Sequence, residues 1–597
     1  MGIMKIKNTK NVVNLISLAS LLFGTLLLSA CSKKEQTTEK VLNIAVTAEV
    51  KGMDPIFAND KYSANEVARV YEGLLEYDYL KRPYTLVPNL AEALPTVSED
   101  GLTYTFKIKQ GVVFQDDAAF PGGKGRELEA EDFVYSIKRL ADPKLQGLGW
   151  WLLDEKIKGL NEWRNKYAEK DTVDYSEKIE GLYAADKYTL VFKLSKPFPQ
   201  FLYSLAMPFT FVVAKEVVEK YGKEFINHPV GTGAFYLGKF NPSSKRIEYV
   251  KNPTFRKKLF PSEASDEFKH MLADAGKELP LVEKVVVNVI SESQPRWLNF
   301  QKGKIDYSAV DKDNFDSVIS EGKNLSKKLT DKGISLEISA SLDVTYTAFN
   351  HDLKLFDNVD LRRALALGVD IHENNKLFYN NTALPAQSVV PPGIAGYMKD
   401  YKSPYRERDL AKAKELLAKA GYPDGKGLPE ITYDCPSSST SRQIGELFKK
   451  QMSDIGVNIK VVQNTWPELQ KKITTRQVML YGIAWGADYP DAENFLQLLY
   501  GPNKAPGANG SGYNNPEFNK LFATASVMQD SPERTALYEK LNRIAAEQAP
   551  WIYGVHRQNY TLQHSWLKNY MSTDFESGQA QYLNIDLEQK KKALDKL

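Results

Sequence analysis

The stretch 409–485 most constrains the fold, because strand and helix patterns alternate along it without interruption. Apolar residues at helical spacing predict a first helix over 409–420. The elements predicted after it are a strand at 431–435, a helix at 444–455, a strand at 457–461, a helix at 467–475 and a strand at 478–485. Right-handed crossovers make such strands parallel, and ligands of parallel sheets bind beyond the carboxyl ends of the strands. We therefore predict an α/β protein with a binding edge near residue 485.

The N-terminal half mixes the same two patterns. Leu42, Ile44 and Val46 alternate as in a strand, and a capping box of Ser63 and Glu66 predicts the start of a helix. The further elements predicted are strands at 104–108 and 188–194 and a helix at 128–140. With 597 residues, 43% of them hydrophobic, the chain has enough apolar material for two or three domains.

The N-terminus carries the pattern of an export signal. Residues 11–30 are almost free of charge and follow three lysines, as the apolar and basic regions of a secretory signal do. The sequence LSAC at 28–31 resembles a bacterial lipobox, in which cleavage before Cys31 leaves a cysteine that carries a diacylglycerol. We therefore expect a signal peptide over 1–30 and a tether over 31–40 that holds the protein at a membrane. An uncleaved transmembrane anchor is the alternative interpretation.

Charge and cysteine content argue against two other classes of site. Loss of residues 1–30 lowers Lys plus Arg from 78 to 75, against 75 Asp plus Glu, so the mature chain is neutral. A nucleic-acid partner is therefore not expected, since phosphate binding requires clustered positive charge. Once Cys31 is acylated, Cys435 has no partner for an intramolecular disulfide. The six histidines lack zinc-ligand spacing, so no metal or other cofactor is expected.

The segment WGADYPDAENF follows the last predicted strand and contains three acids. Paired carboxylates there would suit a glycoside hydrolase. Asp491 and Glu493 are better interpreted as charges at a helix start, where the helix dipole stabilises them. Asp488 lies between Trp485 and Tyr489, and an acid between aromatic walls at the carboxyl end of a strand suits a cationic ligand group. The alternative is a core aspartate that caps the next turn.

Eight segments along the chain together carry a family pattern. They are LNIAVTAEVKGMDP, YEGLLEYD, LVPNLAEALPTVSEDGLTYTFKIKQGVVFQDD, LEAEDFVYSIKRLADP, GTGAFYLGKF, DVTYTAFNHDLKLFDNVDLRRALALGVD, WGADYPDAENFL and SPERTALYEKLNRIAAEQAPWI. In order and spacing they resemble the family 5 extracellular solute-binding proteins, the peptide-binding receptors of ATP-driven importers. The resemblance runs from Val41 nearly to the C-terminus.

The resemblance implies a two-lobed periplasmic-binding-protein fold, type II-like and of cluster C, that closes on its ligand by a hinge motion. Lobe I would be discontinuous and would carry an appended subdomain. The expected boundaries are 41–82, 200–340 and 551–597 for lobe I, 83–199 for the subdomain and 341–550 for lobe II. The segment 256–280 is longer than expected for the plain oligopeptide binders, and would be a surface insertion or a lid-like element.

The resemblance also implies the ligand contacts. Asp488 would pair with the α-ammonium group of a peptide, whose main chain would be added as a strand. The other expected contacts are Trp485, Gly486, Ala487, Tyr489, Glu49, Val50, Thr232, Gly233 and Asn350. For the glycines beside Thr232 the favoured interpretation is a tight turn with positive φ, and Asn350 alternatively fixes a crossing strand. Gly482 stands where some oligopeptide binders have an arginine, so no partner for the peptide carboxylate is identified. Arg362 and Arg363 are expected in helix-surface or interlobe ion pairs.

Together these features predict a monomeric, lipid-anchored receptor of the cell envelope. It would capture peptides outside the cytoplasmic membrane and deliver them to a permease with cytoplasmic ATPases, without catalysis. Within the same fold, the alternative ligands are a nickel chelate, haem, an oligosaccharide or an opine, and a signalling or chaperone-like lipoprotein is a further alternative. Peptide length stays open, as does the membrane that holds the lipid, because Ser32 and not an aspartate follows the cysteine.

Overall fold

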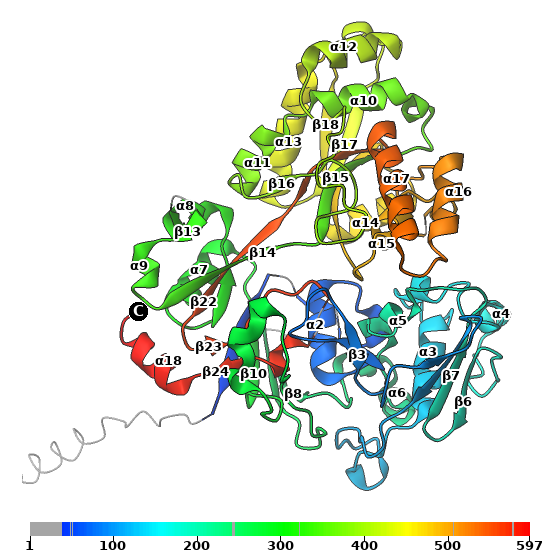
Figure 1. Cartoon of the computed structure of the whole chain (residues 1–597), viewed down its shortest axis with the longest axis vertical. Helices are drawn as coiled ribbons and strands as arrows, with labels where there is room; N and C mark the ends of the chain where they lie inside the picture. The colour runs from blue at the N-terminus through cyan, green and yellow to red at the C-terminus, as the bar shows by residue number, and fades with distance from the viewer. Residues whose placement is uncertain are drawn as a thin grey trace, which may run out of the picture.

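The structure is a computed structural model that describes residues 39–47, 49–50, 52–241, 245–320, 323–505, 507–575 and 578–597. The predicted signal peptide, Cys31 and most of the expected tether lie outside the described residues. The described part forms two bodies joined by two crossing segments, with lobe II above lobe I in Figure 1. Among these residues, no helix is long and apolar enough to cross a membrane.

Lobe I is built on two sheets, with the strand orders β1-β10-β9-β8 and β11-β22-β14. Their strands are β1 (Val41–Val46), β8 (Phe235–Asn241), β9 (Arg246–Lys251), β10 (Lys284–Val289), β11 (Tyr307–Ala309), β14 (Ile334–Ala340) and β22 (Gln558–His564). The helices around them are α2 (Lys61–Val70), α5 (Phe201–Ser204), α6 (Lys215–Tyr221), α7 (Ser293–Gln301), α8 (Phe315–Val318), α9 (Lys327–Thr330) and α18 (Leu587–Leu594). The short strand pairs are β2 (Leu75–Tyr77) with β3 (Leu86–Pro88), β12 (Ile319–Ser320) with β13 (Asn324–Leu325), and β23 (Leu567–Lys568) with β24 (Asn584–Ile585). The predicted first strand is thus confirmed, and Leu42 and Ile44 are buried in the core of lobe I.

Helix α2 begins earlier than the predicted capping box. Its N-cap is Asp60, whose carboxylate accepts hydrogen bonds from the backbone N–H groups of Tyr62 and Ser63. Ser63 therefore lies inside the first turn, and the capping-box prediction is wrong because Asp60 already satisfies the free N–H groups of the helix start. Glu66 pairs instead with Arg69, at 3.1 Å, in a buried ion pair.

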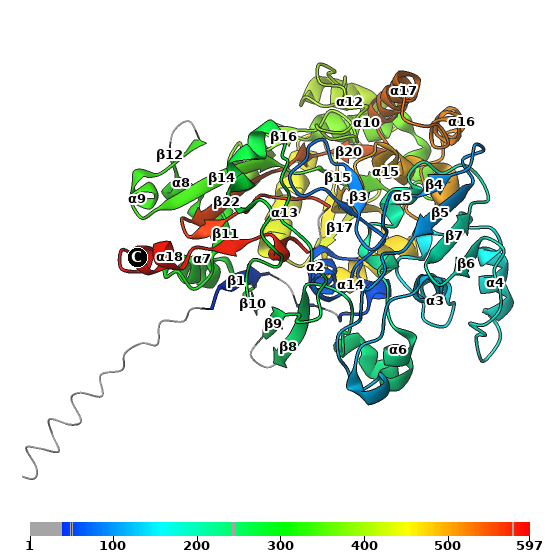
Figure 2. The ribbon, with the colours of Figure 1, turned by 60° about the horizontal axis from the view of Figure 1, so that its bottom comes forward.

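The appended subdomain is a four-stranded antiparallel sheet covered by helices. Its sheet has the order β4-β5-β7-β6. Its elements are β4 (Thr96–Val97), β5 (Thr103–Lys107), β6 (Leu182–Asp186), β7 (Thr189–Lys193), α3 (Ala130–Ala141) and α4 (Leu160–Tyr167). Phe106 and Phe192 of the sheet share one hydrophobic core with Leu42 of lobe I. Figure 2 shows the subdomain gathered at the side of lobe I, so both form one lower body.

The segment 256–280 lies on the surface of lobe I and packs against it through a few buried side chains. The ring of Phe260 lies edge-on to Tyr79, with centroids 6.3 Å apart. Arg256 donates two hydrogen bonds to the buried carboxylate of Glu72, at 2.6 and 2.8 Å. These contacts hold the segment against lobe I, which favours the surface-insertion interpretation.

Lobe II contains a five-stranded sheet of order β18-β17-β19-β15-β20. Its strands and the small pair beside it are β15 (Asp343–Phe349), β16 (Leu384–Pro385), β17 (Ile431–Pro436), β18 (Ile459–Asn464), β19 (Leu480–Gly486), β20 (Trp551–Tyr553) and β21 (Val555–His556). Its helices are α10 (Val359–Gly368), α11 (Ile371–Tyr379), α12 (Leu410–Lys419), α13 (Ser439–Ser453), α14 (Trp466–Thr474), α15 (Glu493–Leu496), α16 (Pro516–Ala525) and α17 (Pro532–Gln548). Strand β17 pairs in parallel with both β18 and β19, which confirms the alternation predicted over 409–485.

Two chain segments cross between the lobes, as the long strands β14 and β22 show in Figure 1. One leads from β14 into β15 through residues 341–342, and the other leads from β21 into β22 through Arg557. Ser341 donates its N–H to the carbonyl of Arg557 at 3.0 Å, and the Arg557 side chain pairs with the buried carboxylate of Asp343 at 2.7 Å. Because β20 and β21 pair with β15 and β16, lobe II extends to residue 556 and does not end at 550.

Arg362 of α10 is buried, with 4% of its surface exposed. Its guanidinium donates to the backbone carbonyls of Phe356, Asp357, Gln548 and Ala549. Within the described residues no carboxylate forms an ion pair with it, and burial lowers its pKa to about 10. The predicted ion pair is therefore wrong for Arg362, whereas Arg363 lies 3.9 Å from Asp360.

Candidate ligand-binding site

The carboxyl end of β19 lies at the seam between the lobes. After Gly486 the chain turns and enters α15 at the lower end of lobe II (Figure 1). Tyr489 in this turn stacks on Tyr203 of α5 in lobe I, with ring centroids 5.8 Å apart and 2° between the planes. Asp491 accepts a hydrogen bond from the buried Gln200 of lobe I at 3.3 Å. The predicted binding edge therefore faces the other lobe.

Strand β19 has a free backbone edge at this end. Strand β15 pairs along its whole length, whereas β17 pairs only with its first two residues. The N–H of Ala487 donates to the carbonyl of Leu342, beside β15, at 2.8 Å. Since backbone groups alternate sides along an antiparallel strand, the N–H and C=O groups of Ala484 and Gly486 point away from β15. No strand in the described part of the chain pairs with them on that side.

This alternation revises the expected backbone contacts. Of the predicted trio, Trp485 and Ala487 direct their groups toward β15, and Gly486 alone faces the free edge. Ala484 joins it, two residues earlier, although the sequence pattern gave no reason to include it. A Cβ built on Gly486 would meet nothing within 4 Å, so one face of the strand is open at this residue.

Asp488 lies just beyond the strand and carries a carboxylate without a cationic partner. Its Oδ2 accepts a hydrogen bond from Asn494 Nδ2 at 2.9 Å. No lysine or arginine of the described chain shifts the pKa of Asp488. Loss of hydration raises that pKa to about 6, and the hydrogen bond from Asn494 opposes the rise. Asp488 is half-buried, and a carboxylate that has lost part of its hydration is costly when unpaired, so a ligand cation would complete this site.

The two aromatic residues that flank Asp488 in the sequence have different places. Trp485 is partly exposed and donates its Nε1–H to Asn494 Oδ1 at 3.0 Å, which holds the indole beside the residue that also holds Asp488. Tyr489 is buried, and its hydroxyl donates to Glu493. Trp485 therefore shares Asn494 with Asp488, and its role as a wall of the site stays a prediction, while Tyr489 belongs to the contact between the lobes.

Asp491 and Glu493 are engaged in internal contacts. Asp491 pairs with Arg534 at 2.8 Å and accepts a hydrogen bond from the backbone N–H of Glu493 at 2.8 Å. Glu493 accepts from Tyr489, and burial raises its pKa to about 7. Neither acid is open to a substrate, as the paired carboxylates of a glycoside hydrolase must be. Their position at the start of α15 agrees with the helix-start interpretation.

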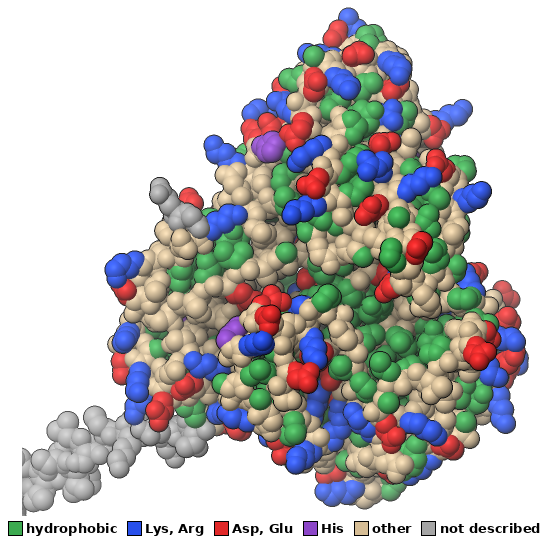
Figure 3. Space-filling model, viewed as in Figure 1, with side chains coloured by type: hydrophobic (Ala, Val, Ile, Leu, Met, Phe, Trp, Pro, Cys, Tyr) green, Lys and Arg blue, Asp and Glu red, His purple; other side chains and the backbone are tan. Residues whose placement is uncertain are grey.

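Lobe I contributes aromatic rings that no local sequence pattern singles out. Tyr77, Tyr84 and Phe575 contact one another, with ring centroids 4.6 to 5.8 Å apart. Tyr203 lies parallel to Tyr77 at 6.3 Å, and Tyr84 and Phe575 pack against the core of lobe II. Figure 3 shows hydrophobic side chains along the hollow between the lobes. These rings come from three distant segments, so only the fold brings them together.

Glu49 and Val50 follow β1 at its carboxyl end. The Glu49 carboxylate lies 2.9 Å from Lys245 in an exposed ion pair, so this side chain is directed to the surface. Val50 packs against the core of lobe I. Contact between their backbone and a peptide stays a prediction.

Thr232 and Gly233 are buried beneath α2. Thr232 is 1% exposed and donates its hydroxyl to Glu72 at 2.9 Å. A Cβ on Gly233 would lie 2.7 Å from the backbone of Val70, and neither Gly233 nor Gly231 has a positive φ. The positive-φ interpretation is therefore wrong, because close approach of two backbones explains the glycines. Both residues are buried, so neither presents a surface to a ligand.

Asn350 follows β15 at the end away from the hinge. Its Nδ2 donates to the carbonyls of Arg476 and Val478, and its Oδ1 accepts from the Arg476 side chain at 2.8 Å. At about 3.3 Å per residue, the seven residues of β15 separate Asn350 from the hinge by about 23 Å. It fixes the start of β19, which agrees with a role in strand positioning, and it lies far from Asp488.

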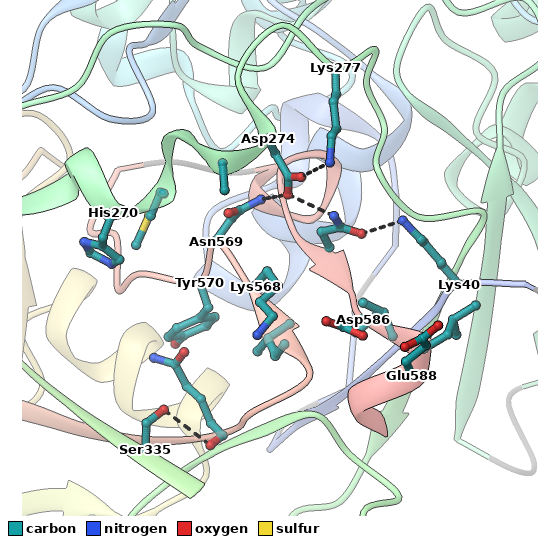
Figure 4. A pocket seen from close by; sticks show the side chains of 17 residues that line it. Lys40, His270, Asp274, Lys277, Ser335, Lys568, Asn569, Tyr570, Asp586 and Glu588 are labelled. Carbon is teal, nitrogen blue, oxygen red and sulfur yellow. Dashed lines mark hydrogen bonds and ion pairs between the residues drawn. The ribbon is translucent and has the colours of Figure 1, made fainter. Parts of the chain in front are cut away.

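A cavity of about 680 Å³ lies elsewhere in lobe I (Figure 4). Its central carboxylate, Asp274, accepts hydrogen bonds from Asn569 and Asn584 at 2.8 and 2.9 Å and pairs with Lys277. These polar groups satisfy one another, so we do not assign the solute to this cavity. In the part of the chain that the structure describes, no group of three His, Cys, Asp or Glu could hold a metal ion.

Residues 85–507 match the family model of the bacterial extracellular solute-binding proteins, family 5. The chain belongs to this family. Among its relatives, Heme-binding protein A of Haemophilus influenzae is 27% identical over 579 residues, which cover 92% of this chain and 96% of that protein. Glutathione-binding protein GsiB of Escherichia coli is 27% identical over 543 residues, which cover 90% of this chain and 92% of that protein.

Solved structures of other binding proteins are similar to this family 5 protein over nearly its whole length. The ABC transporter-associated periplasmic binding protein DppA from Helicobacter pylori, in complex with the peptide STSA, has a TM-score of 0.73 and 26% identity and covers 93% of this chain and 100% of its own. The murein tripeptide binding protein MppA of Escherichia coli has a TM-score of 0.72 and 23% identity, with 92% and 99% covered. The predicted family and its periplasmic-binding-protein fold are thus confirmed, and the family comprises extracellular binding proteins.

Proposed function

We propose that this protein captures peptides between its lobes and delivers them to the permease of an ABC importer. One observation carries the proposal: the free strand edge at Ala484 and Gly486 lies beside the cation-free carboxylate of Asp488. A peptide added as a strand would bond through its main chain, and its α-ammonium group would meet Asp488. Because main-chain recognition accepts many sequences, we expect a range of peptides as ligands.

The charge of Asp488 should carry a large part of the affinity. An ammonium group enclosed between two lobes loses its hydration, and a carboxylate must replace it. Replacement Asp488→Ala is therefore expected to weaken peptide binding by about 2 to 5 kcal/mol. Asp488→Asn keeps the shape of the side chain and tests the charge alone.

The similar proteins support this ligand class. DppA was solved with a peptide and MppA is named for a tripeptide, while GsiB is named for glutathione, itself a small peptide with a free ammonium group. Haem is the alternative ligand, because one of the relatives is named Heme-binding protein A. Haem has no peptide main chain for the edge of β19 and no ammonium group for Asp488. The same mismatch weakens the case for nickel chelates and oligosaccharides.

Capture of a defined peptide library tests the proposal. An equimolar library of tri- to pentapeptides and the same library with acetylated amino termini are mixed with the protein, and bound peptides are quantified by mass spectrometry. We expect the free-amine library to be retained by the wild type and lost from Asp488→Asn, while Asp331→Asn, at an exposed acid after α9, behaves as the wild type. Equal retention of both libraries, or tight binding of haemin without peptide capture, contradicts the proposal.

The receptor would be held at the membrane surface through a lipid on Cys31. The apolar run at 11–30 and the sequence LSAC at 28–31 support a lipid anchor. The position at which the described chain first contacts lobe I limits the length of the tether. There, Lys40 donates its N–H to Glu283 at 2.7 Å, so the expected tether ends at Glu39. The residues between Cys31 and Glu39 can span at most about 28 Å, which keeps lobe I near the membrane. Labelling with an alkyne fatty acid should mark the wild type and not Cys31→Ala; equal labelling of both contradicts the anchor.

A further inference from the structure

A buried asparagine lies directly behind the carboxylate of Asp488. Asn494 is the second residue of α15 and is 0% exposed. Its Oδ1 accepts hydrogen bonds from Trp485 Nε1 at 3.0 Å and from the backbone N–H of Asp488 at 2.9 Å. Its Nδ2 donates to Asp488 Oδ2 at 2.9 Å. One amide therefore holds both the indole and the carboxylate.

The partners of Asn494 fix the orientation of its amide. Two N–H donors face its oxygen, and one carboxylate oxygen faces its nitrogen, so the opposite orientation would set donor against donor twice. The backbone is fixed as well, because the N–H of Asn494 donates to the carbonyl of Asp491 at 3.1 Å. Asp491 is in turn held by the buried guanidinium of Arg534 at 2.8 Å. This asparagine is thus a rigid support.

The neutrality of the support matters as much as its rigidity. A lysine or arginine behind Asp488 would also hold the carboxylate, but its charge would cancel the attraction of the site for a ligand cation. An amide donor engages one oxygen and leaves the net charge of the carboxylate at minus one. The other oxygen, Oδ1, has no hydrogen-bond partner among the described residues.

We propose that Asn494 is a positioning residue of the binding site, which holds Asp488 and Trp485 so that the free carboxylate oxygen meets the ammonium group of a peptide. The assignment rests on the proposed function of Asp488. A merely structural asparagine would stabilise the fold without affecting the discrimination between free and acetylated amino termini. A positioning residue affects that discrimination, because the geometry of the carboxylate decides how well an ammonium is met.

The variant Asn494→Asp separates the two roles. It keeps the shape and the oxygen that accepts from Trp485 and Asp488, but it sets a second carboxylate against Asp488 Oδ2. Two carboxylates at this distance cannot both ionise easily, so the pair keeps one shared proton to a higher pH, and its single negative charge is divided between Asp488 and the new side chain. At pH 7 we expect about 10- to 100-fold weaker capture of the free-amine library and a ratio of free to acetylated capture nearer one. Capture should recover at higher pH, where the shared proton is lost, so the pH profile differs from that of the wild type.

Asn542→Asp is the matched control. Asn542 is also 0% exposed, lies on α17 of the same lobe, and accepts from the backbone N–H of Val389 at 3.1 Å. We expect this variant to lose stability while keeping the wild-type capture ratio and pH profile. If Asn494→Asp does not fold, Asn494→Ser removes the same donor without adding charge and should give the same loss of discrimination.

The outcomes distinguish this inference from the proposed function. If Asp488→Asn abolishes the preference for free amino termini while the Asn494 variants keep the wild-type ratio and pH profile, Asn494 is merely structural and the inference is overturned. If Asp488→Asn itself keeps the wild-type preference, the proposed function is contradicted, because it assigns the ammonium group to Asp488. Loss of the preference in both variants, with Asn542→Asp unchanged, supports both assignments.

Discussion

Glu493 should make the stability of the protein fall as the pH rises toward neutrality. Its carboxyl is 7% exposed, accepts from the Tyr489 hydroxyl, and is faced by Asp491, by Lys156 of the subdomain and by Arg534 of α17. Burial dominates these contacts and raises the pKa of Glu493 from 4.5 to about 7. The native protein therefore binds a proton more tightly than the unfolded chain does, and this stabilisation is present at low pH and lost between pH 4.5 and 7.

The magnitude follows from the two pKa values of Glu493. Between pH 5 and pH 8, a shift from 4.5 to about 7 removes about 2.5 kcal/mol of unfolding free energy. Glu493→Gln keeps an acceptor for the Tyr489 hydroxyl and cannot ionise, so it lacks this loss. The free energy of unfolding of the variant, relative to that of the wild type, should therefore be about 2.5 kcal/mol higher at pH 8 than at pH 5.

Urea denaturation followed by tryptophan fluorescence measures this difference. The wild type, Glu493→Gln and the control Glu415→Gln, at an exposed position of α12, are unfolded at pH 5 and at pH 8. The control should follow the wild type at both values. If the difference in stability between Glu493→Gln and the wild type is the same at pH 5 and at pH 8, the argument from burial is refuted.

Three further outcomes are expected. Arg362→Met removes the donor of four carbonyl hydrogen bonds and should destabilise the protein by about 3 kcal/mol; an unchanged urea midpoint contradicts this. In Gly482→Ala the new Cβ would lie 2.0 Å from the Tyr433 hydroxyl oxygen, so stability should fall by about 1 to 3 kcal/mol in thermal unfolding. The double variant with Tyr433→Phe should recover only part of this loss, because the ring carbon Cζ would still lie 2.7 Å from the new Cβ. Peptide affinity, measured by calorimetry, should fall as the pH is lowered through about 6, because protonation removes the charge of Asp488; the same affinity at pH 7.5 and pH 5 contradicts this.

The repeated elements of lobe II could be predicted because their signals are local. Apolar periodicity over 409–485 reports strands and helices directly, and the parallel pairing of β17 follows from their order. The position of Asp488 at the end of β19 follows from the same pattern. These parts of the fold and the site depend on neighbours in the sequence.

The parts that could not be predicted depend on distant neighbours. Whether Ala484 or Ala487 presents its backbone to the free edge is decided by the register with β15, which no periodicity fixes. The group of Tyr77, Tyr203 and Phe575 exists only because three segments meet at the seam. Arg362 has the sequence context of a surface residue, yet a neighbouring helix end supplies carbonyls that bury it.

Lobe II is one uninterrupted length of chain set into a lobe that is itself divided, and its two ends meet where Ser341 bonds to Arg557 at 3.0 Å. A segment with adjoining ends can be exchanged without moving the pieces on either side of it. Substitution of residues 341–557 by the corresponding length of a relative would therefore transfer Asp488 and its surroundings as one cassette. New solute preferences can arise in this way through a single recombination tract, while the half of the receptor that carries the N-terminus stays as it was.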